Sequence, residues 1–164
     1  VDLRDGLHTM KSRSGLCEEC VLFDEIDIDA VRAHEYDCII VDEAQFLTKQ
    51  EVLFLTDVVD LHNVPVICYG LRADFSGSFF PGSQWLMAWA DTIEEIKTIC
   101  WCGRKAICNA RLDGRGGITK VGEQVVLGAD DKYISLCRKH WREGDPGPGL
   151  RANDQLSKDG NLTE

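Results

Sequence analysis

Two short apolar runs separated by a helical pattern constrain the fold of this chain more than any other feature. Residues 38–41 are apolar throughout and are followed directly by Asp42 and Glu43, and a second apolar run spans residues 64–69. Between them, residues 45–59 carry apolar positions at helical spacing. Strands that are apolar on both faces and joined through a helix are typical of a parallel sheet covered by helices. The sequence therefore predicts an α/β core.

Asp42 and Glu43 stand where the first predicted strand ends. In nucleotide-binding α/β sheets, ligands collect beyond the carboxyl ends of the strands, and an aspartate there can hold Mg²⁺ at the nucleotide phosphates. A glutamate one residue further on can take a proton from an attacking hydroxyl or water. An acidic pair is equally compatible with the first turn of a helix, where the helix dipole stabilises carboxylates. The local pattern leaves both interpretations open.

Two close pairs of soft ligands, Cys100 with Cys102 and Cys137 with His140, indicate a metal site. Each pair can occupy one edge of a tetrahedron, and zinc then closes the 34 residues between the pairs into a loop. The alternative is that two cysteines are simply buried and the histidine lies on the surface.

The other five cysteines are not expected to form a second metal site. Cys17 and Cys20 have C-x-x-C spacing, but no second pair is free to complete a site, so we interpret this spacing as accidental. Cys38 and Cys68 lie inside predicted strands and are expected to pack there. Cys108 is compatible with either a core thiol or a spare ligand.

Composition excludes several classes of protein. The chain has 164 residues, 44% of them hydrophobic, which is enough to form a core and excludes wholesale disorder. Its formal net charge of −10 makes sequence-independent binding of nucleic acid a poor hypothesis. No apolar run reaches the roughly 18 residues that span a bilayer, and no apolar segment follows a basic one near Val1. We expect a cytoplasmic protein whose cysteines are reduced.

The remaining segments are assigned from their local patterns. In chain order these are a loop over 1–20, a short strand and a helix over 21–35, a functional loop over 71–83, a helix over 84–89, a strand over 93–99, and short strands at 123–127 and 133–136. We expect three parts: an α/β domain over 1–98, a small accessory domain over 99–143, and a disordered tail over 144–164.

Several aromatic side chains lie in or beside predicted loops, away from core periodicity. They could form the walls of a pocket for a planar ring, although scattered aromatic residues more often belong to an ordinary core. They are Phe46, Phe75, Phe79, Phe80 and Tyr133.

Taken together, four motifs in one order resemble the cytosolic, zinc-containing thymidine kinases of type II, over about residues 1–142. The motifs are Ile39-Ile40-Val41-Asp42-Glu43-Ala44-Gln45-Phe46; Cys68-Tyr69-Gly70-Leu71-Arg72 with Asp74-Phe75; Cys100-Trp101-Cys102-Gly103-Arg104-Lys105-Ala106; and Gly128-Ala129-Asp130-Asp131-Lys132-Tyr133 leading into Cys137-Arg138-Lys139-His140.

The resemblance implies a fold and a reaction. The fold is a P-loop or RecA-like parallel sheet covered by helices, followed by a small zinc-ribbon-like domain with a lasso loop that closes over the nucleoside. The reaction transfers the γ-phosphoryl group of ATP to the 5′-hydroxyl of thymidine and gives dTMP, in pyrimidine salvage for DNA synthesis. The implied cofactors are ATP, Mg²⁺ and a structural Zn²⁺. The implied partners are thymidine, ATP, dTTP as feedback inhibitor and further copies of the chain in a homotetramer, with neither nucleic acid nor membrane.

The resemblance also implies roles for individual residues. Glu43 is the base for the 5′-hydroxyl. The ATP and Mg²⁺ site takes Asp2, Leu3, Arg4, Asp42, Glu43, Ala44 and Gln45. The thymidine pocket takes Phe46, Leu71, Phe75, Phe80 and Tyr133, with the backbone of Val125, Val126, Leu127, Gly128 and Ala129 reading the base. The zinc ligands are Cys100, Cys102, Cys137 and His140, and a full set of four protein ligands makes the zinc structural.

The sequence departs from the family pattern in two places. No G-x-x-x-x-G-K-[ST] phosphate loop occurs in the 164 residues, so we expect weak or absent kinase activity from this polypeptide alone, either as a fragment or as a homologue that has lost catalysis. Asn109 stands where the animal enzymes have a hydroxyl residue near the base, which leaves selectivity against deoxyuridine open. Two alternatives remain: a DExx-type ATPase fragment with a nucleic-acid-binding zinc module, and a non-catalytic zinc-stabilised module.

Overall fold

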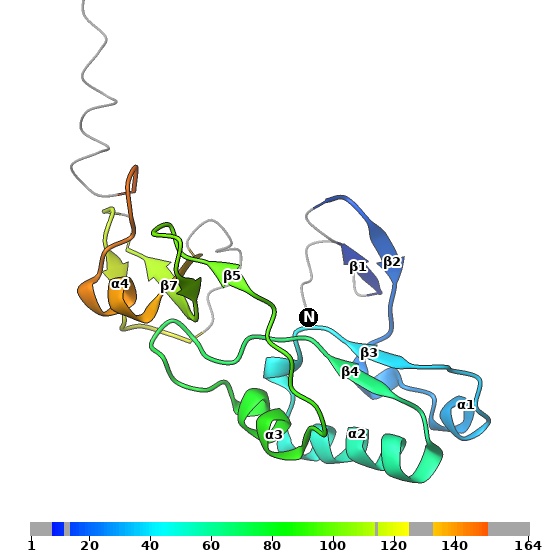
Figure 1. Ribbon diagram of the computed structural model, residues 1–164. Helices are drawn as coiled ribbons and strands as arrows, with labels where there is room; N and C mark the ends of the chain where they lie inside the picture. The colour runs from blue at the N-terminus through cyan, green and yellow to red at the C-terminus, as the bar shows by residue number, and fades with distance from the viewer. Residues whose placement is uncertain (1–7, 12–13, 114, 125–132, 151–164) are drawn as a thin grey trace, which may run out of the picture. The chain divides into compact units, whose positions relative to one another are not determined.

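The structure is a computed structural model, and it describes residues 8–11, 14–113, 115–124 and 133–150 (Figure 1). The chain divides into two compact units, Val1–Gly70 and Leu71–Glu164. The boundaries predicted at residues 98/99 and 143/144 stay predictions.

The first unit is built around a parallel pair of strands. Strand β3 (Ile39–Val41) pairs with β4 (Val66–Cys68), and Ile40 lies opposite Ile67. The connection contains the 3₁₀ turn η3 (Ala44–Phe46) and helix α2 (Lys49–His62), which runs along one side of the pair in Figure 1. The predicted parallel strand–helix–strand unit is confirmed.

Local chemistry sets both ends of α2. The Thr48 hydroxyl accepts a hydrogen bond from the Glu51 amide, and the Glu51 carboxylate accepts one from the Thr48 amide, so the helix begins with a capping box. It ends at Asn63, whose left-handed conformation terminates the helix. On its inner face Val58 packs with Val31 of α1 (Ile28–Arg32) and with Val64, and this cluster is the core of the unit.

Two predictions for the first unit were wrong. Residues 1–20 were predicted to form a loop, yet β1 (Thr9–Lys11) and β2 (Cys17–Glu19) pair as an antiparallel hairpin. All three residues of β2 are exposed, so the hairpin leaves no apolar alternation in the sequence. The strand predicted at the start of 21–35 is a 3₁₀ turn, η2 (Phe23–Glu25), before α1.

Within its described residues, the second unit contains two small sheets and two helices. Helix α3 (Pro81–Trp89) comes first and confirms the predicted helix at 84–89. Strands β5 (Thr98–Ile99) and β6 (Lys105–Ala106) form an antiparallel hairpin. Strands β7 (Cys108–Leu112), β8 (Ile118–Thr119) and β9 (Tyr133–Leu136) form an antiparallel sheet in the order β8-β7-β9. Helix α4 (Arg138–Glu143) follows β9.

The core of the second unit gathers around the predicted metal ligands. The buried residues of this cluster are Cys100, Ala106, Ala110, Leu136 and Cys137. A domain with so small an apolar core gains much of its stability from additional cross-links such as a metal. The metal ligands therefore lie where they can stabilise the unit most.

Predictions for the second unit were partly right. The strand expected over 93–99 is limited to Thr98–Ile99, and Ile93 and Ile96 are exposed. The strand at 133–136 is confirmed, but Glu123 and Gln124 lie outside any strand, and 125–127 fall outside the described residues. Residues 144–150, assigned to a disordered tail, instead form turns in which the Asp145 amide bonds to the His140 carbonyl. The remainder of the predicted tail, 151–164, is outside the described residues.

Across the described part of the chain, every helix is too short or too polar to cross a membrane.

Candidate active site and metal centre

The two predicted catalytic acids lie on a strained turn at the carboxyl end of β3. Glu43 has φ 52° and ψ 32°, the left-handed region that non-glycine residues rarely adopt. The Asp42 carboxylate accepts a hydrogen bond of 2.9 Å from the Glu43 amide. Both side chains are exposed. Strain of this kind persists only where the surrounding structure enforces it, and it is found most often at functional sites.

Buried Gln45 holds the Glu43 side chain. Its side chain is 1% exposed, and its Nε2 donates to Glu43 Oε2. At the end of β4, Gly70 passes so close that an added Cβ would lie 2.7 Å from Gln45 Oε1 and 3.0 Å from the Gln45 amide nitrogen. The Ala44 amide donates to the Tyr69 carbonyl at 2.9 Å. The two strand ends therefore fix the turn from both sides, and residue 70 has to be glycine.

The structure describes only some of the other residues predicted for the ATP site, together with Phe46 of the predicted thymidine pocket. Ala44 is fully buried beneath the turn, and Phe46 is 46% exposed at its end. Asp2, Leu3 and Arg4 lie outside the described residues. The structure thus brings Asp42, Glu43 and Gln45 together, whereas the roles predicted for these residues stay predictions.

The predicted zinc ligands converge at one point in the second unit. The four ligand atoms of Cys100, Cys102, Cys137 and His140 lie within 4.8 Å of one another. His140 Nδ1 lies 3.4 Å from Cys100 Sγ and 3.6 Å from Cys137 Sγ, and the sulfurs of Cys102 and Cys137 are 4.0 Å apart. With Zn–S near 2.3 Å and Zn–N near 2.0 Å, the edges of a tetrahedral site are about 3.8 Å between two sulfurs and about 3.5 Å between sulfur and nitrogen. The cluster therefore fits a tetrahedral zinc ion.

Secondary structure positions each pair of ligands. Cys100 and Cys102 lie in the turn of the β5–β6 hairpin, where Gly103 has φ 83° and its amide donates to the Cys100 carbonyl. Cys137 is the residue before α4, and His140 lies one helical turn later on the same face. The Trp101 ring stacks on the His140 ring with centroids 4.2 Å apart, which fixes the plane of the imidazole.

The thiols of this cluster are chemically distinct. Burial raises the pKa of Cys100, but hydrogen bonds from the Cys102 and Cys137 backbone and from His140 outweigh burial and lower the pKa to about 6. At Cys102 the hydrogen bond from the Arg104 backbone lowers the pKa, but burial and the neighbouring cysteines outweigh it and raise the pKa. One thiolate therefore forms readily and disfavours a second, until a divalent cation compensates the charge.

Cys108 lies outside this cluster, which removes it as a spare ligand. It is half-buried on β7, and burial raises the pKa of its thiol. Of the other cysteines, Cys68 packs partly buried on β4 as predicted, whereas Cys38 is exposed and precedes β3. The prediction that Cys38 packs inside a strand was wrong.

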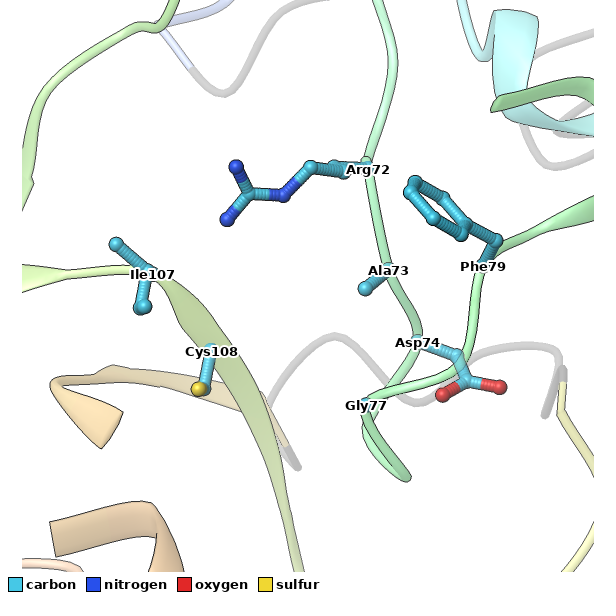
Figure 2. Close-up of a pocket in the computed structure, with 7 residues that line it drawn as sticks. All are labelled: Arg72, Ala73, Asp74, Gly77, Phe79, Ile107 and Cys108. Carbon is cyan, nitrogen blue, oxygen red and sulfur yellow. The ribbon is translucent and has the colours of Figure 1, made fainter. Parts of the chain in front are cut away.

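The loop after Leu71 borders a cavity of about 200 Å³ in the second unit. Figure 2 shows Arg72, Ala73 and Phe79 on one wall and Ile107 and Cys108 on the other. Phe79, one of the aromatic residues predicted as possible pocket walls, lines the cavity, whereas the described thymidine-pocket residues that the resemblance implies in this unit do not. Of these, Phe75 and Phe80 are buried, Tyr133 is half-buried on β9, and Leu71 is 45% exposed. Residues 125–129 lie outside the described residues.

Sequence reasoning missed the polar side chains that support this loop. Asp74 is buried, and Arg111 on β7 lies over the Phe75 ring at 3.7 Å from its centroid. The Asn109 side chain, predicted near the base, donates to the Ala73 carbonyl at 3.3 Å. The contacts of Arg111 with Phe75 and of Asn109 with Ala73 join segments far apart in the sequence, and no local pattern could reveal them.

The fold and the site together define a class: α/β proteins with a parallel strand–helix–strand unit, an acidic turn at its carboxyl end, and a β-module with a Cys₃His cluster that can hold zinc. The comparisons with known proteins agree. The family model described as thymidine kinase matches residues 1–141, and the chain belongs to the thymidine kinase family.

Curated relatives support the same assignment. The chain is 44% identical over 168 residues to a thymidine kinase of Legionella pneumophila (strain Paris), an alignment that covers 98% of this chain and 80% of the relative. It is 48% identical over 149 residues to a thymidine kinase of Mannheimia succiniciproducens, covering 87% and 76%. It is 49% identical over 149 residues to a thymidine kinase of Escherichia coli O157:H7, covering 87% and 73%.

Proposed function

We propose that this chain acts in the ATP-dependent phosphorylation of thymidine, in which the γ-phosphoryl group moves to the 5′-hydroxyl and gives dTMP and ADP. The observation that carries the proposal is the family match over residues 1–141, within which the Asp42-Glu43 turn closes a parallel strand pair. A P-loop or RecA-like sheet is the architecture that this strand pair supports.

Glu43 is proposed as the general base. As the 5′-oxygen attacks the γ-phosphorus, its proton passes to the Glu43 carboxylate, and the bond to the β-phosphate oxygen breaks to release ADP. The hydrogen bond from Gln45 to Oε2 leaves Oε1 free of that contact and fixes the direction of the carboxylate. Fixed direction matters because this reaction is catalysed mainly by positioning and charge stabilisation.

Asp42 is proposed to hold Mg²⁺, with Ala44, Gln45, Asp2, Leu3 and Arg4 contributing to the phosphate side. A carboxylate oxygen is the ligand type that Mg²⁺ prefers, and the exposed Asp42 side chain offers one. When bound, Mg²⁺ neutralises charge on the phosphates.

The nucleoside side is proposed to include Phe46, Leu71, Phe75, Phe80 and Tyr133, together with the backbone of residues 125–129. Aromatic side chains provide flat walls for a pyrimidine, and backbone amides and carbonyls read its polar edge. A base that leaves one of those groups unpaired is disfavoured.

Zinc at Cys100, Cys102, Cys137 and His140 is proposed to be structural. Four protein ligands leave no open position for water or substrate, so the ion stabilises the second unit and takes no part in the reaction.

Feedback inhibition by dTTP, assembly into a homotetramer and a cytoplasmic location complete the proposal. The family match favours this proposal over the two alternatives, an ATPase fragment with a nucleic-acid module and a non-catalytic zinc module.

Thymidine binding and phosphoryl transfer test the proposal separately. Calorimetric titration of the 164-residue chain is expected to show saturable binding of one thymidine and none of adenosine. Transfer from labelled ATP, measured with enzyme in excess because the chain holds no phosphate-loop motif, is expected to fall about 100-fold or more in E43Q. Thymidine affinity in E43Q should stay within about twofold, since the base acts on the transition state.

Asp60 on α2 provides the matched control. It is an exposed acid of the same unit, and D60N changes the net charge as E43Q does. D60N is expected to keep both transfer and affinity. A chain that binds no thymidine, or an E43Q variant that transfers phosphate as fast as the unmodified chain, would contradict the proposal.

A further inference from the structure

Asp74 is a buried carboxylate with four hydrogen bonds. Its side chain is 8% exposed, and Oδ1 accepts bonds from the Ser76 amide at 2.9 Å, the Ser76 hydroxyl at 2.7 Å and the Ser78 amide at 3.0 Å. These three bonds close the loop that follows Phe75. Burial raises the pKa of Asp74, but the bonds from Ser76, Gln124 and Ser78 outweigh it, so the pKa is lowered and the group is ionised.

The second oxygen of Asp74 reaches a distant part of the chain. Oδ2 accepts a hydrogen bond of 2.8 Å from Gln124 Nε2, fifty residues later in the sequence. Asp74 also lines the cavity between the loop and β7, and in Figure 2 its carboxylate points away from Ile107 and Cys108 on the opposite wall. Gln124 directly precedes residue 125, where the proposed base-reading backbone begins.

Arg111 joins the same two segments by a second route. It is 8% exposed, and its guanidinium donates to the Val121 carbonyl at 3.0 Å and to the Glu123 carbonyl at 2.8 Å. The same guanidinium lies over the Phe75 ring. One side chain therefore fixes both the backbone of 121–123 and the aromatic ring next to Asp74.

Gly122 makes this arrangement possible. It lies between the two carbonyls that Arg111 binds, has φ 128°, and an added Cβ would overlap Arg111 Nη2. Phe75 is held from a further direction as well, because its carbonyl accepts a hydrogen bond of 3.0 Å from Trp141 Nε1. Phe75 is 2% exposed and is held by both Arg111 and Trp141.

A simpler explanation is that these contacts only stabilise a loop. Asp113, whose side chain is exposed, shows what loop closure alone requires: its Oδ1 accepts bonds from the Arg115 and Gly117 amides, and among the described residues no distant side chain bonds to it as Gln124 bonds to Asp74. Burying an ionised carboxylate is costly unless each oxygen is satisfied. The bond from Asp74 to Gln124 therefore adds something that turn formation does not explain, namely a fixed distance between Phe75 and the chain that enters residue 125.

We propose that Asp74, Gln124 and Arg111 are positioning residues for nucleoside binding, which set Phe75 and the 121–124 backbone at the spacing that a pyrimidine nucleoside requires. This inference rests on the proposed function, since Phe75 is one of the proposed pocket residues. The three residues act through Phe75 and the backbone and are not assigned contact with the nucleoside.

Exchange of donor and acceptor across the Asp74–Gln124 bond tests the proposal. In Q124E two carboxylates face each other, and thymidine affinity measured by calorimetry is expected to fall about tenfold or more. In D74N/Q124E the new amide donates to the new carboxylate, while the amide oxygen still accepts from Ser76 and Ser78. Affinity is expected to return to within about threefold of the unmodified chain, and such recovery measures coupling of the pair.

D113A is the matched control, because it removes an aspartate that closes a loop of the same unit by similar bonds. It is expected to lower the melting temperature yet keep thymidine affinity within about twofold. A folded Q124E that binds thymidine like the unmodified chain, or a double variant without recovery, would overturn the proposal. If the unmodified chain binds no thymidine, the proposed function fails and the positioning role fails with it. Hydrogen exchange at the Ser76 and Ser78 amides, which donate to Asp74, would then report independently whether the hydrogen bonds of Asp74 stabilise the structure.

Discussion

The left-handed backbone at Glu43 makes a stability prediction that can be separated from catalysis. Glu43 has φ 52° and ψ 32°, so any residue with a Cβ is strained there and glycine is not. We therefore expect the variant E43G to be more stable than E43A, the reverse of the usual order. Both variants lose the hydrogen bond from Gln45, so that loss cancels in the comparison.

The magnitude follows from two opposing terms. The left-handed conformation costs alanine about 1–2 kcal/mol, and glycine avoids this cost. Glycine loses more backbone freedom on folding, which costs about 0.5–1 kcal/mol relative to alanine. At the midpoints of these ranges the difference is about 0.75 kcal/mol in the free energy of unfolding, in favour of E43G.

Two other positions provide controls for the backbone effect. Asn63 ends α2 at φ 52° and ψ 36°, so N63G should also be more stable than N63A, by a similar amount. Asp57 is exposed in the middle of α2, where D57G should be less stable than D57A by about 1 kcal/mol.

Equilibrium unfolding in urea measures the difference in the free energy of unfolding between the glycine and alanine variants at positions 43, 63 and 57. Phosphoryl transfer measures the separate catalytic effect of the Glu43 variants. Both Glu43 variants lack the carboxylate and should lose transfer, whereas both Asn63 variants should keep it. An E43A variant as stable as E43G, with the Asn63 and Asp57 pairs behaving as expected, would show that the turn at Glu43 is unstrained and would refute the reasoning.

Three further predictions concern the second unit. C100S should lose bound zinc, and its second unit should no longer unfold cooperatively; adding a chelator to the unmodified chain should have the same effect. C108S should retain one zinc per chain by metal analysis, because Cys108 lies outside the cluster. G122A should lower the free energy of unfolding by about 1–3 kcal/mol, because its Cβ displaces Arg111 from two carbonyl groups; denaturant unfolding checks this, and an unchanged midpoint would contradict it. The pKa of Asp74 is lower in the folded than in the unfolded chain, where it is about 3.9, so ionised Asp74 stabilises the fold above that pH. This stabilisation is lost as the pH falls through the lower folded pKa. The difference in the free energy of unfolding between the unmodified chain and D74A should therefore shrink below about pH 4. A difference that stays constant between pH 3 and 6 would show that the carboxylate is not preferentially ionised in the folded state.

The sequence by itself determined the features that depend on local pattern. The apolar runs at 38–41 and 64–69 correctly predicted a parallel strand pair, but not its burial on both faces, because Ile40 and Ile67 are exposed. The two pairs of soft ligands predicted one metal cluster because zinc requires a particular set of donors and tolerates a long loop between them. Both signals are carried by residue type and spacing alone.

Tertiary structure decided the features that depend on where distant segments meet. The β1–β2 hairpin has an exposed strand and therefore no apolar alternation to predict it. The strain at Glu43 is enforced by Gln45 and by the close approach of Gly70, and Asp74 reaches Gln124 across fifty residues. Burial leaves a periodic trace in the sequence, whereas a hydrogen bond between two polar side chains leaves none, because its partners are set by the path of the whole chain.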